Sequence, residues 1–347
     1  MHTAHDLTRF PAWGVYGHDW AIDFLERGLR YGRTRHAYLF LGPDHIGKTS
    51  LAAAFAMKLN CQHEDEAQRP CGVCRSCRLL RSGNHPDLLT VVGDERSGQI
   101  KIDSVREVMN LLALKPYASR YRVALLTDFD RAQPRAQDAL LKTLEEPASH
   151  AVLLLIANER SAILPTILSR CQVLPLRPPD QATIEAVLRQ VGLAQDQAAL
   201  LARLSGGRIG WALGAAQEGA VLANRAAYLD SLVELLHSKR QARFKQADEL
   251  GKVAAKDKGV ARYVVETWLS YWRDLVLLGQ GQAALICNLD REAELVRLAG
   301  LILADDALRA LRETRHFLVE VLPTNANVRL ALEVLMLEYP FLGQAAR

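Results

Sequence analysis

The first half of the chain alternates short apolar runs with segments of helical periodicity. The apolar runs are four to seven residues long, rich in Val, Leu and Ile, and bounded by turn-forming residues, which is typical of buried parallel strands. They are AYLFL (37–41), LLTVV (88–92), VALLT (123–127), AVLLLIA (151–157) and VLPL (173–176). Strands that alternate with helices predict an α/β layer fold with a parallel sheet.

Helical patterns fill the spaces between these runs, at 48–60, 103–114 and 136–146. Asp103 or Ser104 is a candidate N-cap for the second of these helices because both side chains can accept a bond from a free backbone amide. Beyond LRPPD (176–180) the strand pattern stops and the sequence reads as helix. We therefore expect three domains: an α/β domain at 1–177, a small helical lid at 178–218 and an all-α domain at 219–347.

Composition and charge add few constraints. The chain has 347 residues, 49% of them hydrophobic and 24% charged, which is typical of a globular protein with sizeable cores. It has no apolar run of about 18 residues, and its N-terminus lacks the layout of a secretory signal, so we expect a cytoplasmic protein with no membrane partner. The net charge of +4 permits contact with nucleic acid without requiring it, and scattered basic residues are most simply a solvated surface.

The segment GPDHIGKTS (42–50) fits the phosphate-loop template G-x-x-x-x-G-K-[ST]. Gly42 follows an expected strand, and Lys48 and Thr49 open an expected helix, which is the context that such a loop requires. Gly42 and Gly47 let backbone amides turn toward phosphates, Lys48 would reach the β- and γ-phosphates, and Thr49 would hold Mg²⁺. The motif predicts binding of ATP or ADP with Mg²⁺, which is a separate matter from hydrolysis.

Four cysteines with the spacing C-x9-C-x2-C-x2-C lie within residues 61–77. Four thiolates complete a tetrahedral zinc shell, and a closed site of this kind is structural. His63 and His85 are competing ligands, and an iron–sulfur cluster is an alternative that nothing else in the sequence favours. Cys171 and Cys287 stand alone in the sequence, and most single cysteines are small apolar core residues. The expected zinc ligands are Cys61, Cys71, Cys74 and Cys77.

A zinc module just after a phosphate-loop helix, followed by ALLKTLEEP (139–147) and TILSRC (166–171), is an unusual combination. With these motifs the chain resembles the AAA+ subunits of the bacterial DNA polymerase III clamp loader. The resemblance implies an AAA+ nucleotide-binding-type domain at 1–177, a lid, and a C-terminal domain that packs into an oligomeric collar. It also implies partners: gamma/tau and delta subunits in a hetero-pentamer, the sliding clamp, and primed DNA through the complex.

The hydrolytic positions of this family separate its ATPase type, gamma/tau, from its delta-prime type. A motor subunit carries Asp-Glu after its third strand, whereas this chain has Thr127 and Asp128 there. Asp130 is expected to have left the strand. The lid of a motor subunit supplies an Arg, where the matching segment GRIGWAL (207–213) has Gly210, and Arg208 would point elsewhere. Asn158 keeps the polar position after the fourth strand and is placed to contact a phosphate or water.

One functional residue of the family is retained. Arg170 in the SRC motif matches the arginine finger, which reaches into the ATP site of a neighbouring subunit. A permanent charge and a planar fork suit contact with two phosphate oxygens, although a surface ion pair would explain an isolated Arg equally well. The resemblance therefore implies a delta-prime stator that is a subunit of the polymerase holoenzyme rather than an efficient ATPase by itself.

Three other functions stay open at this point. An active ATPase of the gamma/tau type predicts steady hydrolysis that depends on Lys48. A stand-alone phosphate-loop kinase would need a lid rich in Arg, and this lid has few. A zinc-dependent nucleic-acid module would need base-stacking aromatics near the cysteines, and residues 60–86 contain no Phe, Tyr or Trp.

Overall fold

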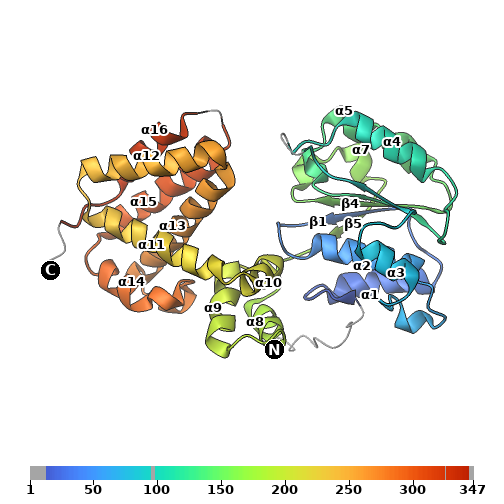
Figure 1. Ribbon diagram of the computed structural model, residues 1–347, viewed down its shortest axis with the longest axis horizontal. Coiled ribbons are helices and arrows are strands. Elements are labelled where there is room, and N and C mark those ends of the chain that lie inside the picture. The colour runs from blue at the N-terminus through green and yellow to red at the C-terminus, as the bar shows by residue number, and fades with distance from the viewer. Residues whose placement is uncertain (1–12, 95–97, 325, 344–347) are drawn as a thin grey trace. The chain divides into compact units, whose positions relative to one another are not determined.

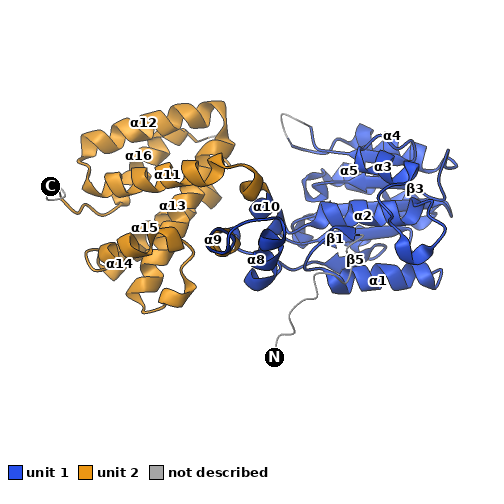
Figure 2. Cartoon of the chain, turned by 60° about the horizontal axis from the view of Figure 1, so that its bottom comes forward, with its two compact units in different colours: residues 1–198, 205–213 blue, residues 199–204, 214–347 orange. Residues whose placement is uncertain are grey.

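The computed structural model describes residues 13–94, 98–324 and 326–343, which form two compact units. One unit extends through residue 198 and also contains 205–213, and the other contains 199–204 and the chain after 213 (Figure 2). We describe each unit by itself. The three expected domains, with boundaries at 177 and 218, remain a prediction.

The first unit is built on a five-stranded sheet in which every neighbouring pair is parallel (Figure 1). The strand order is β2-β3-β4-β1-β5, so the central strands are the apolar ones that the sequence marks most clearly. Their bounds are β1 Ala37–Leu41, β2 Leu88–Val91, β3 Arg122–Leu126, β4 Ala151–Ala157 and β5 Gln172–Pro175. The predicted α/β fold with a parallel sheet is thus confirmed.

Helices cover both faces of this sheet, because alternate side chains of each strand point to opposite sides. Tyr38 and Phe40 of β1 pack in one core with Phe55, whereas Leu39 packs in the other with Phe129. The helices of this unit, including the lid segment, are α1 Asp19–Arg30, α2 Lys48–Asn60, α3 Arg75–Arg81, α4 Ile102–Leu112, α5 Pro134–Asp138, α6 Leu141–Glu145, α7 Pro165–Leu168, α8 Gln181–Gln190, α9 Gln195–Ser205 and α10 Ile209–Gln217, of which α9 and α10 run across the boundary between the units.

The second unit is built of helices joined by turns, with no strand among its described residues, as the sequence predicts. Its long central helix α13 buries Trp268 and Trp272, which pack against Tyr339. Arg243 is buried as well and donates to the carbonyl oxygens of Met336, Tyr339 and Pro340. The helices of this unit are α11 Ala220–His237, α12 Arg240–Lys256, α13 Lys258–Gly279, α14 Glu292–Ala299, α15 Ala304–His316 and α16 Val328–Glu338.

Two local predictions were wrong. Helix α4 begins at Ile102 with Lys101 as its N-cap, so Asp103 and Ser104 lie in the first turn, where an acidic side chain favours the positive end of the helix dipole. The expected helix at 136–146 is two short helices, α5 and α6. Between them the amide of Leu140 bonds three residues back, to Gln137, instead of four.

Candidate phosphate site and metal centre

The loop between β1 and α2 has the backbone that a phosphate loop needs. Gly42 has a φ of +155°, and a Cβ added there would lie 2.5 Å from the carbonyl oxygen of Leu176. Gly47 is the N-cap of α2 and has a φ of +103°, a conformation that strongly favours glycine. Both glycines of the motif are therefore required by the geometry as well as by the template.

Lys48 is buried under this loop. Its ammonium Nζ donates to the carbonyl oxygens of Gly42 at 2.7 Å and Pro43 at 2.5 Å. Burial lowers the pKa of Lys48, and the nearby carboxylates of Asp44, Asp130 and Asp128 act in the opposite direction. The ammonium group of Lys48, the first residue of α2, is thus held by carbonyl groups of the loop itself.

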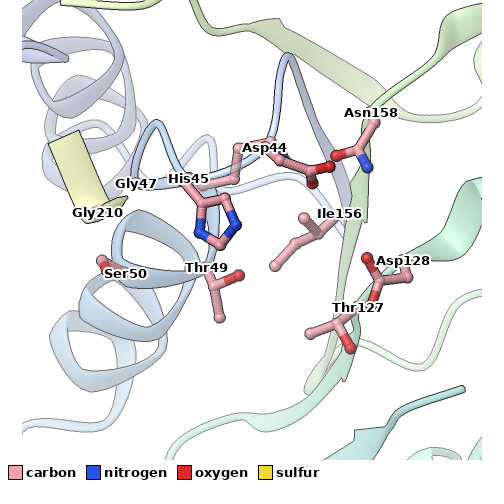
Figure 3. A pocket seen from close by; sticks show the side chains of 11 residues that line it. Asp44, His45, Gly47, Thr49, Ser50, Thr127, Asp128, Ile156, Asn158 and Gly210 are labelled. Carbon is pink, nitrogen blue, oxygen red and sulfur yellow. The ribbon is translucent and has the colours of Figure 1, made fainter. Parts of the chain in front are cut away.

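A cavity of about 310 Å³ opens at this loop (Figure 3). It brings together four of the five residues predicted to bind nucleotide, while the fifth, Gly42, shapes the loop without lining the cavity. Asp44 points toward Asn158 across the loop, and His45 extends over the opening. The lining residues are Asp44, His45, Gly47, Lys48, Thr49, Ser50, Thr127, Asp128, Ile156, Asn158 and Gly210.

Thr127 and Asp128, the residues expected from the resemblance to match a motor subunit's acidic pair, both line this cavity. Thr127 directly follows β3, and its amide at 3.1 Å and its hydroxyl at 3.5 Å both donate to the carbonyl oxygen of Val91. Asp128 lines the cavity in a left-handed conformation, with a φ of +50°. Asp130 has left the strand, as expected, and its Oδ1 accepts a bond from the amide of Asn158 at 3.1 Å.

Gly210 of α10 also lines the cavity, and its amide donates to the carbonyl oxygen of His45 at 2.7 Å. A Cβ at this position would lie 3.0 Å from the same oxygen, so a side chain requires the loop or the helix to shift. Arg208 cannot replace a cavity cation, because its Nε donates to Ser205 and its guanidinium lies over the ring of Trp211. No pattern in the sequence pointed to His45, whose carbonyl makes this contact.

Arg170 is exposed on the surface, outside this cavity. Its Nη2 pairs with Glu145 Oε1 at 2.8 Å, and its Nη1 donates to the carbonyl oxygen of Thr166 at 3.0 Å. The ion pair joins the SRC motif to the end of the ALLKTLEEP helix. An exposed pair of this kind contributes little stability, so a competing anion can displace Glu145 at small cost.

The four predicted zinc ligands come together, and their Sγ atoms all lie within 4.8 Å of one another. Tetrahedral Zn–S bonds of about 2.3 Å place sulfurs about 3.8 Å apart, and Cys61 Sγ lies 4.0 Å from Cys74 Sγ. Backbone amides of Cys71, Cys74 and Cys77 donate to neighbouring sulfurs at 3.3–3.4 Å. The donor set and spacing fit a tetrahedral metal ion.

The surroundings shift the thiols of the cluster in opposite directions: burial raises the pKa of Cys61 and of Cys77, whereas the pKa of Cys71 is lowered. Burial raises the pKa of Cys71, but amides of Cys74 and Val73 and the neighbouring thiols outweigh burial and bring that pKa down to about 6. Gly72 provides the turn between the ligands, with a φ of +71°, and a Cβ there would lie 2.9 Å from the guanidinium of Arg81. The tight turn in CGVC therefore favours glycine at this position.

Neither competing histidine belongs to the cluster. His63 Nδ1 lies 3.2 Å from the amide of Asp65 and accepts its hydrogen bond. His85 is buried, its Nδ1 accepts the amide of Asp87, and burial lowers its pKa, so the ring is neutral. The lone cysteines lie apart from the cluster: burial raises the pKa of Cys171 to about 12, and Cys287 accepts a bond from Arg273.

Comparisons with known proteins agree with this architecture. Residues 17–180 match the family described as DNA polymerase III, delta subunit. DNA polymerase III subunit delta' of Pseudomonas aeruginosa is 40% identical over 156 residues, which are 44% of this chain and 47% of that protein. Subunit tau/gamma of Haemophilus influenzae is 36% identical over 177 residues, 51% of this chain and 25% of that protein. The chain thus spans about half or less of the curated relatives it matches.

A solved structure of a DNA polymerase III gamma subunit-related protein from Thermotoga maritima aligns with 90% of this chain and 97% of its own. The TM-score is 0.47 and the identity is 18%. Within the described residues, none of the helices is long and apolar enough to cross a bilayer.

Proposed function

We propose, from the match of residues 17–180 to the family described as DNA polymerase III, delta subunit, that the chain is the delta-prime (stator) subunit of a bacterial clamp loader. In this role it supports ATP-dependent loading of the sliding clamp onto primed DNA. Its partners are gamma/tau and delta subunits in a hetero-pentamer in the cytoplasm. The relatives named delta' and tau/gamma support the complex as a whole, and the choice between the two types rests on the site.

One observation carries that choice: Thr127 and Gly210 line the phosphate cavity at the positions where a motor subunit has a carboxylate and an Arg. A neutral hydroxyl lacks the negative charge that a carboxylate at position 127 would add to the Mg²⁺ shell, and glycine at position 210 has no cation to neutralise charge on a transferring phosphoryl group. Lys48 and Thr49 remain in position for binding. The chain is proposed to bind ATP or ADP with Mg²⁺ at Gly42, Gly47, Lys48, Thr49 and Asn158, without efficient turnover.

Arg170 is proposed to act in trans, on ATP bound to an adjacent subunit. It lies outside the cavity of its own chain and is exposed, and the single carboxylate that pairs with it is itself exposed. A γ-phosphate of the neighbour would replace Glu145 as its partner. Zn²⁺ on the four cysteines is proposed to be structural, since its shell is complete without a water or substrate.

The test is a complex reconstituted from the loader subunits with Arg170→Ala in this chain. An arginine finger contributes about 10³-fold or more to the rate at its site, so the complex should lose the whole share of hydrolysis that belongs to the contacted subunit. Glu145→Gln, which removes the ion pair but keeps the guanidinium, should retain the rate, as should Arg189→Ala at an exposed position on α8. Unchanged hydrolysis in an assembled Arg170→Ala complex would contradict the proposal.

A second candidate is an ATPase of the gamma/tau type. It is favoured by the intact phosphate loop and by the identity to tau/gamma relatives, which is similar to that for delta'. In that case Asp128 would replace the missing acidic pair. The isolated chain would then hydrolyse ATP steadily and in a manner that depends on Lys48.

A further inference from the structure

Two segments that are far apart in sequence meet at the buried ring of His85. Its Nε2 lies 3.2 Å from Ser76 Oγ of helix α3, in the cysteine module, and 3.1 Å from Ser119 Oγ, in the loop after α4. Because Nδ1 accepts the amide of Asp87, Nε2 carries the proton of the neutral ring and donates to these hydroxyls. The cysteine module and the loop at 113–120 are therefore neighbours, held by one side chain.

The backbone of this loop is fixed by side chains from outside it. The buried carboxylate of Asp87 accepts the amide of Tyr117 at 2.6 Å with one oxygen and the amide of Ala118 at 2.8 Å with the other. Two further side chains bond to its carbonyl oxygens: Arg122 to Lys115 at 3.3 Å and His150 to Leu114 at 2.9 Å. These hydrogen bonds hold the loop in one conformation, and they offset the free-energy cost of burying two polar side chains, His85 and Asp87.

The side chains that this rigid loop presents do not stabilise the fold. Tyr117 is 85% exposed and Leu114 is 56% exposed, although their backbone groups are held in place. An aromatic ring on a fixed backbone has little conformational entropy left to lose on binding, and its face is available for stacking. A loop built in this way has the properties of a recognition element.

Charge is segregated around the same point. Residues 71–86 and 113–122 together contain six basic side chains and no Asp or Glu, in a chain with 39 acidic residues. Arg75, Arg78 and Arg81 repeat every three residues along α3, all of them exposed. Among the described residues none of these three arginines forms an ion pair. These two segments are complementary to a polyanion, whereas the acidic residues of the cysteine module, Glu64, Asp65 and Glu66, lie outside them in the exposed stretch before Cys71.

We infer that this arginine–tyrosine surface, defined as Arg75, Arg78, Arg81, Lys115 and Tyr117, binds single-stranded nucleic acid. The cations contact successive phosphates and Tyr117 stacks on a base, a combination that holds a strand without reading its sequence. A single strand fits better than a duplex because paired bases do not offer their faces to a side chain. The cysteine site holds the start of α3, the helix that carries the arginines, because Cys74, the N-cap of α3, and Cys77 in its first turn both belong to the cysteine cluster.

The sequence did not reveal this surface because its aromatic side chain comes from a segment far in sequence from the cysteine module. Residues 60–86 contain no Phe, Tyr or Trp, which argued against a nucleic-acid role for the cysteine module. The fold supplies Tyr117 from the loop after α4, through contacts of His85 and Asp87 that no local pattern shows. Strand binding at this surface does not depend on the proposed place of the chain in a clamp loader.

The test is binding of a fluorescent oligonucleotide of about 20 thymidines to the full chain, measured by anisotropy from about 50 to 300 mM salt. Log affinity should fall with log salt by about 0.7 for each phosphate contacted. The triple variant Arg75→Ala/Arg78→Ala/Arg81→Ala should reduce that slope by about 2. Tyr117→Ala should weaken binding about 5- to 100-fold at every salt concentration and leave the slope unchanged, whereas Tyr117→Phe should bind as the parent chain does.

Matched controls separate this surface from general charge and exposure. Arg297→Ala/Arg312→Ala/Arg315→Ala removes three exposed arginines from the second unit, and Tyr31→Ala removes a tyrosine that is 67% exposed. Both controls should bind as the parent chain does. A uridine oligonucleotide distinguishes RNA from DNA, and a duplex of equal length should bind more weakly. The inference would be overturned if test and control variants changed oligonucleotide binding equally, or if the parent chain did not bind at about 50 mM salt. Melting temperature and metal content confirm that each variant is folded.

Discussion

At Gly210 the backbone amide and the absence of a side chain together allow close contact with the carbonyl oxygen of His45. The amide donates to His45 at 2.7 Å, and a Cβ added at Gly210 would lie 3.0 Å from that same oxygen. Gly210, which the resemblance matches to the Arg of a motor subunit's lid, therefore makes a backbone contact between α10 and the phosphate loop. The alignment of GRIGWAL predicted from sequence that Arg is absent at position 210. The bond from the Gly210 amide to His45 could not be predicted, because its acceptor is a backbone carbonyl group and every residue has one.

Replacing Gly210 with Ala tests this contact. Ala stabilises a helix interior by up to about 1 kcal/mol relative to Gly, which is the full effect expected for Gly214→Ala on the same helix, where a Cβ would meet nothing within 4 Å. Gly210→Ala should gain less or lose stability, because the loop must shift by a few tenths of an ångström, and its nucleotide affinity should change. Thermal unfolding and nucleotide titration provide the readouts. Equal melting temperatures and affinities in the two variants would show that the contact is unimportant.

At the scale of elements, the strands were predictable and the helix boundaries less so. Each predicted strand lies within one residue of the observed one, since continuous runs such as AVLLLIA have no other stable place than a buried sheet. The break between α5 and α6 was not predictable, because it occurs next to Gln137. That buried amide bonds to Ala132, Ala162 and Leu164, contacts that depend on the tertiary fold. The cysteine module was predictable because its ligands are close in sequence.

Metal removal tests that module as an element. The purified chain should contain one Zn²⁺, and Cys74→Ser should lose it, although the Ser hydroxyl can still cap α3 by accepting the amide of Cys77. Binding free energy at such sites is folding free energy, so we expect the melting temperature of the first unit to fall by about 5–10 °C. Cys171→Ser, at a cysteine outside the cluster, should keep the metal. A chain that purifies without metal and is indifferent to a chelator would contradict the assignment.

At the scale of the whole molecule, different parts of one chain have different proposed tasks. The phosphate cavity is proposed to bind nucleotide without turning it over, Arg170 to serve a neighbour, and the helical second unit to join the collar. The sequence predicted the two kinds of layer, α/β and all-α, from their periodicity. It could not predict how the second unit packs, because Trp268, Trp272 and Tyr339 meet only after about 70 residues of intervening chain have folded.

The most direct measurement compares nucleotide binding with ATP hydrolysis for the isolated chain and for the reconstituted complex, using the parent chain, Lys48→Ala and Arg170→Ala. We predict that the isolated parent chain binds nucleotide but shows no steady hydrolysis. Lys48→Ala should abolish that binding and leave hydrolysis by the complex largely unchanged, whereas Arg170→Ala should retain binding and lower hydrolysis by the complex. Steady hydrolysis by the isolated chain that disappears with Lys48→Ala would contradict the stator role and identify an ATPase instead.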